Sequence, residues 1–361
     1  MTKLKLDNSY LKNYKNLKVL VTGTTGFKGA WLANWLNILG AKVIGVSLKP
    51  EKGSILFSCF SLNQKIKQYY FDIANFKKLN EIVKKNNPDI IFHLAAQSIV
   101  SQGFSEPLKT IQTNILGSAN ILETFRLNKI PALVYITSDK CYLNLNKKIN
   151  YKETDILGGL DNYSSSKASA EIIFSSYFHS YFKKKNFLEA ASARAGNVMG
   201  GGDMKKNRII PDIIKSLRSN KKLFLRKPKA TRPWQHVLEP ISGYLLIGDK
   251  LINKKLKTKL IPSWNFGPKL KNCKTVEVIT GLVKENWKKK NMKIKVKSKN
   301  TYYESNFLSL NIQKAKKELG WEPKLTLKET VKLTVDWYNA YFKNKNIDNF
   351  TRKQIEFFTN K

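Results

Sequence analysis

The sequence is poor in cysteine, histidine and long apolar runs, and each shortage excludes a class of protein. Its 361 residues include three cysteines, Cys59, Cys141 and Cys273, which are too few and too far apart for a disulfide framework or a CxxC metal pair. The three histidines form no HExxH pair, so we predict no metal site. No run approaches the ~18 apolar residues of a membrane span, and the polar start lacks a secretory core. We therefore expect a reduced, cytoplasmic protein with no membrane partner.

Acidic residues are also scarce relative to basic ones. The chain has 65 Lys and Arg against 26 Asp and Glu, for a net charge of +39. Such a surface can attract nucleic acid, an anionic membrane or an anionic small substrate. The basic residues form no single tract and are interspersed with many Asn and Ile. This scatter indicates that the positive charge results from the drift of an AT-rich coding sequence. The alternative is that the charge steers an anionic ligand toward the protein.

Apolar strands alternate with helical periods from residue 17 to about residue 195. We predict strands at 17–22, 41–47, 66–71, 88–96, 131–138 and 187–194, and helices ending near 39 and over 75–86, 108–127 and 163–183. This alternation is typical of an α/β fold with a Rossmann-type, doubly wound parallel sheet, whose ligand lies at the carboxyl ends of the strands. The more irregular remainder predicts a smaller mixed α/β domain. The expected division is 1–195 for the dinucleotide and 196–361 for the substrate, with some chain crossing back.

A glycine-rich turn, VTGTTGFKG, follows the first predicted strand and opens the first helix. Gly23, Gly26 and Gly29 have the spacing that a tight turn, a close approach to a pyrophosphate and helix packing require. The strand–turn–helix context makes this a dinucleotide-binding prediction, in which Thr25 and Phe27 also contact the cofactor.

The adenosine end of the predicted cofactor site is less regular. An acidic residue for the ribose is expected about 20 residues on, yet Ser47 and Lys49 stand there, and Lys49 suits a 2′-phosphate. Asp72, with Ile73 beside it, is a candidate for the adenine, although Asp72 also suits a helix cap. HLAAQ places Ala95, Ala96 and Gln97 where a strand end passes the cofactor, while His93 fits a hydrogen-bonded core position better.

Tyr163 and Lys167 lie one helical turn apart, and Ser138 ends the preceding strand. A free phenol has a pKa near 10, which a neighbouring ammonium and an oxidised nicotinamide would lower. Ser138 can hydrogen-bond the same substrate hydroxyl. Asn114 is a candidate to hold a water that links to Lys167. Together these residues predict an acid–base centre for oxidising an alcohol.

The strings TGTTGFKG, HLAAQ, TSDKCY, YSSSK, ARAGNVMGGGD, RIIPD, TRPWQHV and WNFGP resemble the extended short-chain dehydrogenase/reductases, an NAD-dependent epimerase/dehydratase family. The resemblance covers about residues 18–338. It is strongest to members that dehydrate nucleotide sugars and implies NAD as cofactor and CDP-glucose as substrate. The expected product is a 4-keto-6-deoxy sugar, an intermediate of deoxysugar and polysaccharide biosynthesis.

The resemblance also assigns expected roles to residues. Tyr163 takes the proton from the carbon 4 hydroxyl, and Asp139 protonates the hydroxyl that leaves carbon 6. Lys140 stands where relatives carry a glutamate base; it can act as a base only when neutral, and otherwise can steady an enolate.

The substrate diphosphate and the assembly state have candidate residues as well. Arg232, with its bidentate fork, and Arg208 suit the phosphates, while Asn197 and Trp234 are substrate candidates that also fit a turn and the core. The family resemblance further implies a homodimer, packed as a bundle of the helices at 108–127 and 165–183.

Two alternatives remain at this point. One is dehydration or epimerisation of another nucleotide sugar. The other, from a different class, is a catalytically silent dinucleotide-binding protein whose basic surface holds nucleic acid. The presence of Tyr163, Lys167, Ser138 and Asp139 together argues against the second alternative.

Overall fold

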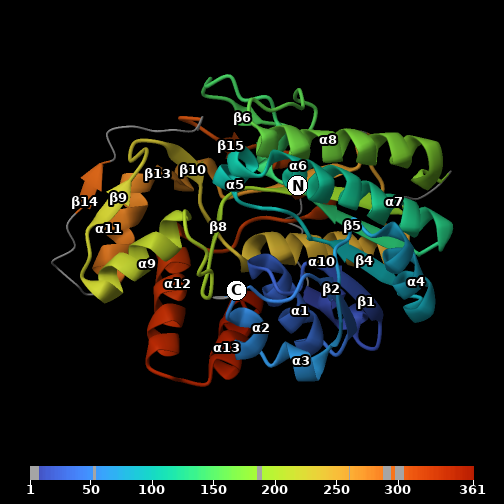
Figure 1. Ribbon diagram of the computed structural model, residues 1–361, viewed down its shortest axis with the longest axis horizontal. Helices are drawn as coiled ribbons and strands as arrows, with labels where there is room; N and C mark the ends of the chain where they lie inside the picture. Colours follow the sequence, from blue (N-terminus) through green and yellow to red (C-terminus); the bar gives the residue numbers. More distant parts are fainter. Residues whose placement is uncertain (1–7, 52–53, 185–188, 260, 288–293, 297–304) are drawn as a thin grey trace.

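Seven parallel strands form the central sheet (Figure 1). The computed structural model describes residues 8–51, 54–184, 189–259, 261–287, 294–296 and 305–361. The sheet order is β12-β7-β5-β4-β1-β2-β3, the doubly wound order expected from the sequence. The strands are β1 (Lys18–Thr22), β2 (Lys42–Ser47), β3 (Lys67–Tyr70), β4 (Ile90–His93), β5 (Ala132–Ile136), β7 (Ala190–Ala195) and β12 (Ser263–Phe266).

Helices cover both faces of this sheet, as Figure 1 shows. One face carries α4 (Phe76–Asn86), α7 (Gly117–Leu127) and α8 (Asn162–Tyr177), and the other carries α1 (Phe27–Ile38) and α10 (Leu238–Ile252). Each of β1, β2, β4, β5 and β7 is buried along almost its whole length, because helices on both sides exclude water. No helix in the described ranges is long and apolar enough to cross a membrane.

The predicted helix over 108–127 is interrupted. It consists of α6 (Pro107–Ile111), a π-helical turn (Gln112–Leu116) and α7. A second π-helical turn (Phe178–Phe182) follows α8. The first π turn contains the buried Asn114, whose side chain bonds outside the helix. Smaller elements of this half are a 3-10 helix (Asn8–Tyr14), α2 (Leu56–Cys59), α3 (Leu62–Lys65), α5 (Val100–Ser105), a 3-10 turn (Asp139–Cys141) and β6 (Asn150–Tyr151).

The chain after residue 196 builds a second layer of short elements beside the strand ends. Its strands pair in small sheets: β10 (Thr231–Pro233) with β13 (Cys273–Thr275), β8 (Val198–Met199) with β11 (Gln235–His236), β9 (Leu223–Leu225) with β14 (Ile294–Val296), and β15 (Ser309–Leu310) with β6. Its helices are α9 (Ile209–Ser219), α11 (Val276–Asn286), α12 (Leu327–Phe342) and α13 (Ile347–Thr359), with short 3-10 and π turns at Leu270–Asn272 and Ala315–Leu319. This part also contributes β12 and α10 to the central layers, so the division near residue 195 stays a prediction.

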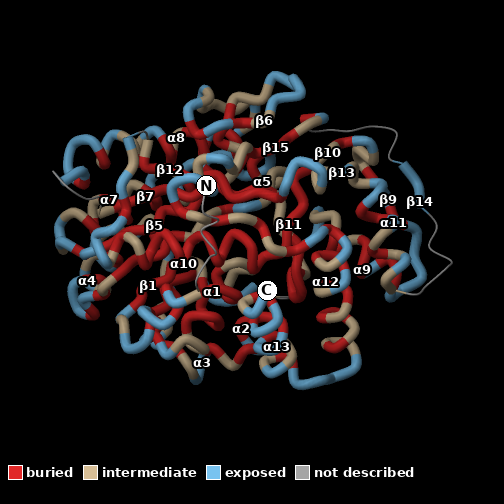
Figure 2. The backbone as a smooth tube through the Cα atoms, turned by 180° about the vertical axis from the view of Figure 1, so that it is seen from behind, coloured by how far each residue is buried: buried red, intermediate tan, exposed pale blue. Residues whose placement is uncertain are grey.

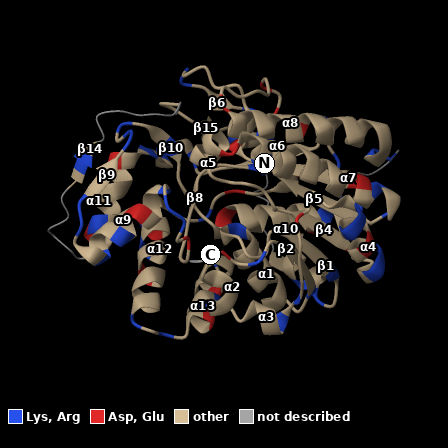
Figure 3. Ribbon diagram, viewed as in Figure 1, with Lys and Arg blue, Asp and Glu red and all other residues tan. Residues whose placement is uncertain are grey.

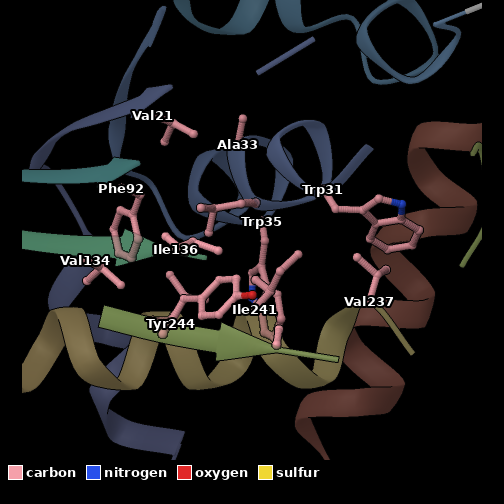
Figure 4. Packing of buried hydrophobic residues seen from close by; sticks show 14 of the residues in the cluster. Val21, Trp31, Ala33, Trp35, Phe92, Val134, Ile136, Val237, Ile241 and Tyr244 are labelled. Carbon is pink, nitrogen blue, oxygen red and sulfur yellow. The ribbon is translucent and has the colours of Figure 1, made fainter. Parts of the chain in front are cut away.

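The core covers both faces of the sheet (Figure 2), and Figure 4 shows the part between the sheet and α1 and α10. Trp31 and Trp35 of α1 and Tyr244 of α10 belong to this core, and all three are almost fully buried. Burying one such side chain contributes about 1.5–3 kcal/mol. This packing holds the strand ends at fixed positions and so fixes the functional groups that follow them.

Candidate active site

A cavity of about 540 Å³ lies at the carboxyl ends of the central strands, between the sheet and the C-terminal layer. All the predicted site residues except Asn114 line it, although their roles remain predictions. They are Gly23, Thr25, Gly26, Phe27, Gly29, Asp72, Ile73, Ala95, Ala96, Gln97, Ser138, Asp139, Lys140, Tyr163, Lys167, Asn197, Arg208, Arg232 and Trp234.

The glycine turn has the geometry that a dinucleotide needs. Gly23 has a φ of +81°, and a Cβ there would lie 3.0 Å from the Ala95 backbone; a Cβ on Gly29 would lie 2.0 Å from the Gly23 carbonyl oxygen. Gly26 is the N-cap of α1 and has no side-chain cap bond. The start of α1 therefore presents backbone to the cavity, and the residues fit a pyrophosphate group.

The adenosine end contains polar groups that bond to one another. Gln68 accepts a hydrogen bond from Thr24 (2.7 Å) and donates one to Ser47 (3.0 Å). Lys49 lines the cavity beside them. The Asp72 carboxylate accepts from the Ala74 backbone N–H at 2.9 Å in the turn before α4, whose cap is Asn75 and not Asp72.

Tyr163 and Lys167 face the cavity from the first turns of α8. The helix starts there because Asp161 caps it, accepting from the Ser164 N–H at 2.9 Å. The Lys167 Nζ atom lies 6.0 Å from the centre of the Tyr163 ring. Both residues are buried, so their ionisation depends on their neighbours rather than on bulk water.

Burial dominates the pKa values at this centre. Desolvation raises the pKa of Tyr163 to about 12, with a further increase from the Asp139 charge that a Ser138 hydrogen bond and Arg208 partly offset. Desolvation and the charge of Lys28 lower the pKa of Lys167 to about 8. The protein alone thus keeps the phenol protonated at neutral pH. Lowering the pKa of Tyr163 requires an additional positive charge in the cavity, such as that of a bound ligand.

Asp139 follows β5 in the 3-10 turn that Ser138 caps. The Ser138 hydroxyl donates to Asp139 Oδ1 at 3.0 Å, whereas Asp139 Oδ2 is buried and has no hydrogen-bond partner among the described residues. Burial raises the pKa of this carboxyl group, although Lys140 and Ser138 oppose the rise. A buried carboxyl oxygen that lacks a protein partner and lies at a cavity can form its hydrogen bond with a bound ligand.

Lys28 is a cavity residue that the sequence analysis did not single out. Desolvation lowers its pKa to about 8, with Asp139 raising it and Arg208 lowering it. The one signal available in the sequence was its setting, a lysine in the first turn of a helix whose next residues, AWLANWL, are almost all apolar.

Asn114 lies in the first π-helical turn and does not line the cavity. Its Oδ1 accepts from the Gln97 N–H (2.8 Å), and its Nδ2 donates to the Gln97 carbonyl (3.0 Å) and to Ser166 Oγ (2.9 Å). The amide thus holds the Gln97 segment against α8, and an Asn114 water that links to Lys167 stays a prediction. The π-helical turn around Asn114 places the amide there, and the sequence pattern carried no sign of that turn.

The substrate side of the cavity is formed by residues of the C-terminal layer. Arg208 pairs with Asp203 at 2.9 Å and donates to Ser98 at 2.7 Å, so it spans the two sides of the cavity. Arg232 is almost fully buried, and its Nη1 donates to the Thr231 carbonyl. Trp234 both lines the cavity and donates to the Lys274 carbonyl at 2.8 Å, so it is part of the packed wall.

The cavity is positively charged overall. Its lining has ten basic residues, among them Lys28, Lys140, Lys167, Arg208 and Arg232, against six acidic ones that include the buried Asp139. Figure 3 marks the basic and acidic positions along the ribbon in blue and red. This arrangement suits an anionic ligand. His93 lies deeper, between Thr22 Oγ1 (2.8 Å) and Ser118 Oγ (3.0 Å), in the hydrogen-bonded core position expected for it.

Comparison with known proteins places these features in a family. A model of the GDP-mannose 4,6 dehydratase family matches residues 20–334. The chain is similar to the CDP-glucose 4,6-dehydratase of Salmonella typhimurium, with 38% identity over 350 residues, which are 95% of this chain and 97% of the relative.

Two solved structures share the fold. One is the UDP-glucose 4-epimerase of Thermotoga maritima with UDP-glucose, at a TM-score of 0.77 and 24% identity over 90% of this chain and 100% of that one. The other is the dTDP-glucose 4,6-dehydratase of Bacillus anthracis in complex with NAD, at a TM-score of 0.75 and 23% identity over 92% and 98%. The Rossmann-type fold class that the sequence predicts is thereby confirmed.

Proposed function

This chain belongs to the GDP-mannose 4,6 dehydratase family, and we propose that it is an NAD-dependent hydro-lyase converting CDP-glucose into CDP-4-keto-6-deoxyglucose. The observation that carries the proposal is the meeting, in one cavity, of the glycine turn, the Tyr163–Lys167 pair and Asp139. The full-length similarity to a CDP-glucose 4,6-dehydratase supports the substrate. The NAD in a structural relative supports the cofactor.

The glycine turn, Ala95, Ala96 and Gln97 are the residues that would hold NAD, which supplies the hydride acceptor for carbon 4 and the hydride donor for carbon 6. Tyr163 Oη takes the proton of the carbon 4 hydroxyl while Ser138 Oγ hydrogen-bonds the same oxygen. The positive charge of Lys167 favours the phenolate that results. Burial raises the pKa of Tyr163 to about 12 in the free protein, and the positive charge of an oxidised nicotinamide would favour this transfer by lowering that pKa.

Elimination follows from the new ketone, which acidifies the carbon 5 proton. Asp139 donates a proton to the hydroxyl that leaves carbon 6 as water. Its raised pKa keeps the carboxyl group protonated to a higher pH than usual, and its unpartnered Oδ2 suits the leaving oxygen. Lys140 faces the same cavity and fits either of two roles, a base that takes the carbon 5 proton when neutral, or a cation that stabilises the enolate while another group takes that proton.

The cationic side of the cavity supports binding of the substrate diphosphate. Arg232 is the first candidate because a buried guanidinium presents a rigid bidentate fork. Arg208 is the second, after exchange of its Asp203 and Ser98 contacts. Asn197 and Trp234 complete this side.

We further propose a homodimer formed through α6, α7 and α8. The exposed apolar side chains on these helices and the π turn between them support it: Leu108 is 79% exposed, Ile172 is 56% and Leu116 is 51%. Apolar side chains gathered on neighbouring helices mark an interaction site. The three free cysteines favour a reducing compartment, which supports placing the enzyme in the cytoplasm.

The test is incubation of the purified protein with NAD and separately with CDP-, dTDP-, UDP- and GDP-glucose, followed by detection of a 4-keto-6-deoxy sugar. Turnover that is greatest with CDP-glucose is the expected result. Turnover with another donor alone would keep the chemistry and replace the substrate, and silence with every donor would contradict the proposal.

A further inference from the structure

A buried ion pair lies beneath the catalytic residues and takes no part in the steps above. Glu171 of α8 and Arg194 of β7 are each 1% exposed, and Arg194 Nη2 donates to Glu171 Oε2 at 2.8 Å. Ser192 Oγ donates to the same carboxylate oxygen at 2.9 Å. Buried charges of this kind are costly unless directional bonds satisfy them, so the contacts of this pair indicate what it does.

The contacts of the pair reach both ends of the segment that carries Asp139 and Lys140. At one end, Thr137 Oγ1 donates to Glu171 Oε1. At the other end, Arg194 Nη1 donates to the Tyr142 hydroxyl at 2.9 Å, and that hydroxyl donates to Asn265 Oδ1 at 2.7 Å. Residues 138–141 thus lie between two anchoring bonds, Thr137 to Glu171 and Arg194 to Tyr142, and Glu171 and Arg194 are themselves paired.

The same pair also belongs to the catalytic helix. Glu171 follows Lys167 by four residues and Tyr163 by eight, so the three side chains share one face of α8. The 3-10 turn of residues 139–141 packs directly on this helix. The pair therefore joins the element that carries the tyrosine to the segment that carries the acid.

We propose that Glu171 and Arg194 are positioning residues that set the place of Asp139 and Lys140 relative to Tyr163 and Lys167. An apolar pair of similar shape can stabilise a core equally well, but it offers no directional bonds to Thr137 and Tyr142. This inference rests on the proposed function, because it assigns the base of the oxidation, Tyr163, to the helix and the acid of the elimination, Asp139, to the segment, where Ser138 contributes only a hydrogen bond to the oxidation. Loosening the segment slows elimination more than oxidation, so reduced nicotinamide accumulates during turnover.

Thr137→Val and Tyr142→Phe each remove one anchor and leave both charges in place, which avoids the folding risk of an uncompensated buried ion. Ser192→Ala is the matched control, because it removes a hydroxyl bonded to the same carboxylate from β7 rather than from the segment. The first measurement is amide hydrogen exchange in the ligand-free protein. We expect exchange at residues 138–141 to rise roughly three- to tenfold in the two anchor variants and to stay within about twofold of wild type in the control.

The second measurement follows reduced nicotinamide after rapid mixing with CDP-glucose and NAD. The anchor variants are expected to slow elimination about tenfold or more and to hold a larger reduced fraction at steady state, whereas Ser192→Ala matches wild type. If all three variants lose equal thermal stability and the fraction of reduced nicotinamide is unchanged, the Glu171–Arg194 pair has a structural role only. If wild-type protein makes no 4-keto sugar from any donor, the proposed function fails, and unchanged exchange at residues 138–141 in the anchor variants would separately overturn the anchoring.

Discussion

The two sides of the cavity are built in different ways. On the catalytic side, Ser138, Asp139, Tyr163 and Lys167 follow a central strand or begin a long helix, and buried bonds hold their supports. On the substrate side, Arg232 belongs to a three-residue strand, and Arg208 precedes α9 with exchangeable polar contacts. In the proposed function the sheet therefore positions the reacting groups, whereas short elements of the C-terminal layer position the substrate. Substitutions on the catalytic side should abolish individual reaction steps, and substitutions on the substrate side should alter the affinity for the nucleotide sugar.

The largest expected effect is on the catalytic side. Tyr163→Phe removes the proton acceptor for the carbon 4 hydroxyl and should lower kcat about 1000-fold, the contribution of a well-placed general base. Affinity for CDP-glucose, measured by calorimetry, should change little. Tyr177→Phe is the control, because it lies on the same helix away from the cavity. Residual turnover within tenfold of wild type would place the base elsewhere.

Asp139→Asn should separate the two chemical stages on that same side. The amide cannot protonate the leaving hydroxyl, so elimination should slow about 100-fold while oxidation at carbon 4 continues. Rapid-mixing absorbance of reduced nicotinamide should then show a burst that decays slowly. If the Asp139→Asn variant instead shows no burst, Asp139 acts in oxidation and its assigned role is wrong.

Arg232→Lys tests the substrate side. Lysine keeps the charge but loses the bidentate fork, so KM for CDP-glucose should rise about tenfold with kcat changed less. Arg218→Lys is matched in chemistry and lies outside the cavity, where its guanidinium stacks on Phe342. A fall in kcat without a rise in KM would move Arg232 from binding to catalysis and weaken the contrast between the two sides.

The smallest effect concerns His236 of β11, which is fully buried against Trp31. Desolvation lowers its pKa to about 3, below the ordinary 6.5. The unfolded chain therefore binds a proton at this residue near pH 6.5, whereas the folded protein does not. Stability therefore falls as pH falls below about 7. Between pH 7.5 and 6, His236→Phe should lose about 1 kcal/mol less unfolding free energy than wild type. If wild type and His236→Phe lose equal unfolding free energy in denaturant titrations at the two pH values, His236 has an ordinary pKa in the folded protein.

The predictable parts of the molecule are those that local pattern controls. The strands β1, β2 and β4 lie within their predicted ranges, and Asn75 caps α4, accepting from the Lys78 N–H at 3.0 Å. The glycine turn follows from spacing alone. The π-helical turn that directs the Asn114 amide toward Gln97 could not be predicted from the sequence pattern. Lys28 was passed over because its setting at the start of an apolar helix does not show that its side chain lines the cavity.

The α/β class, the glycine turn and the Tyr163–Lys167 spacing follow from the sequence, since each depends on residues that are neighbours along one strand or helix. The three-dimensional fold is needed to bring Lys28 into the cavity with Asp139, to raise the pKa of Tyr163 by burial, and to bring Glu171 to Arg194 and Thr137. These contacts join segments far apart in the chain. Desolvation and pairing depend on distance through the fold, which periodicity along the chain does not encode.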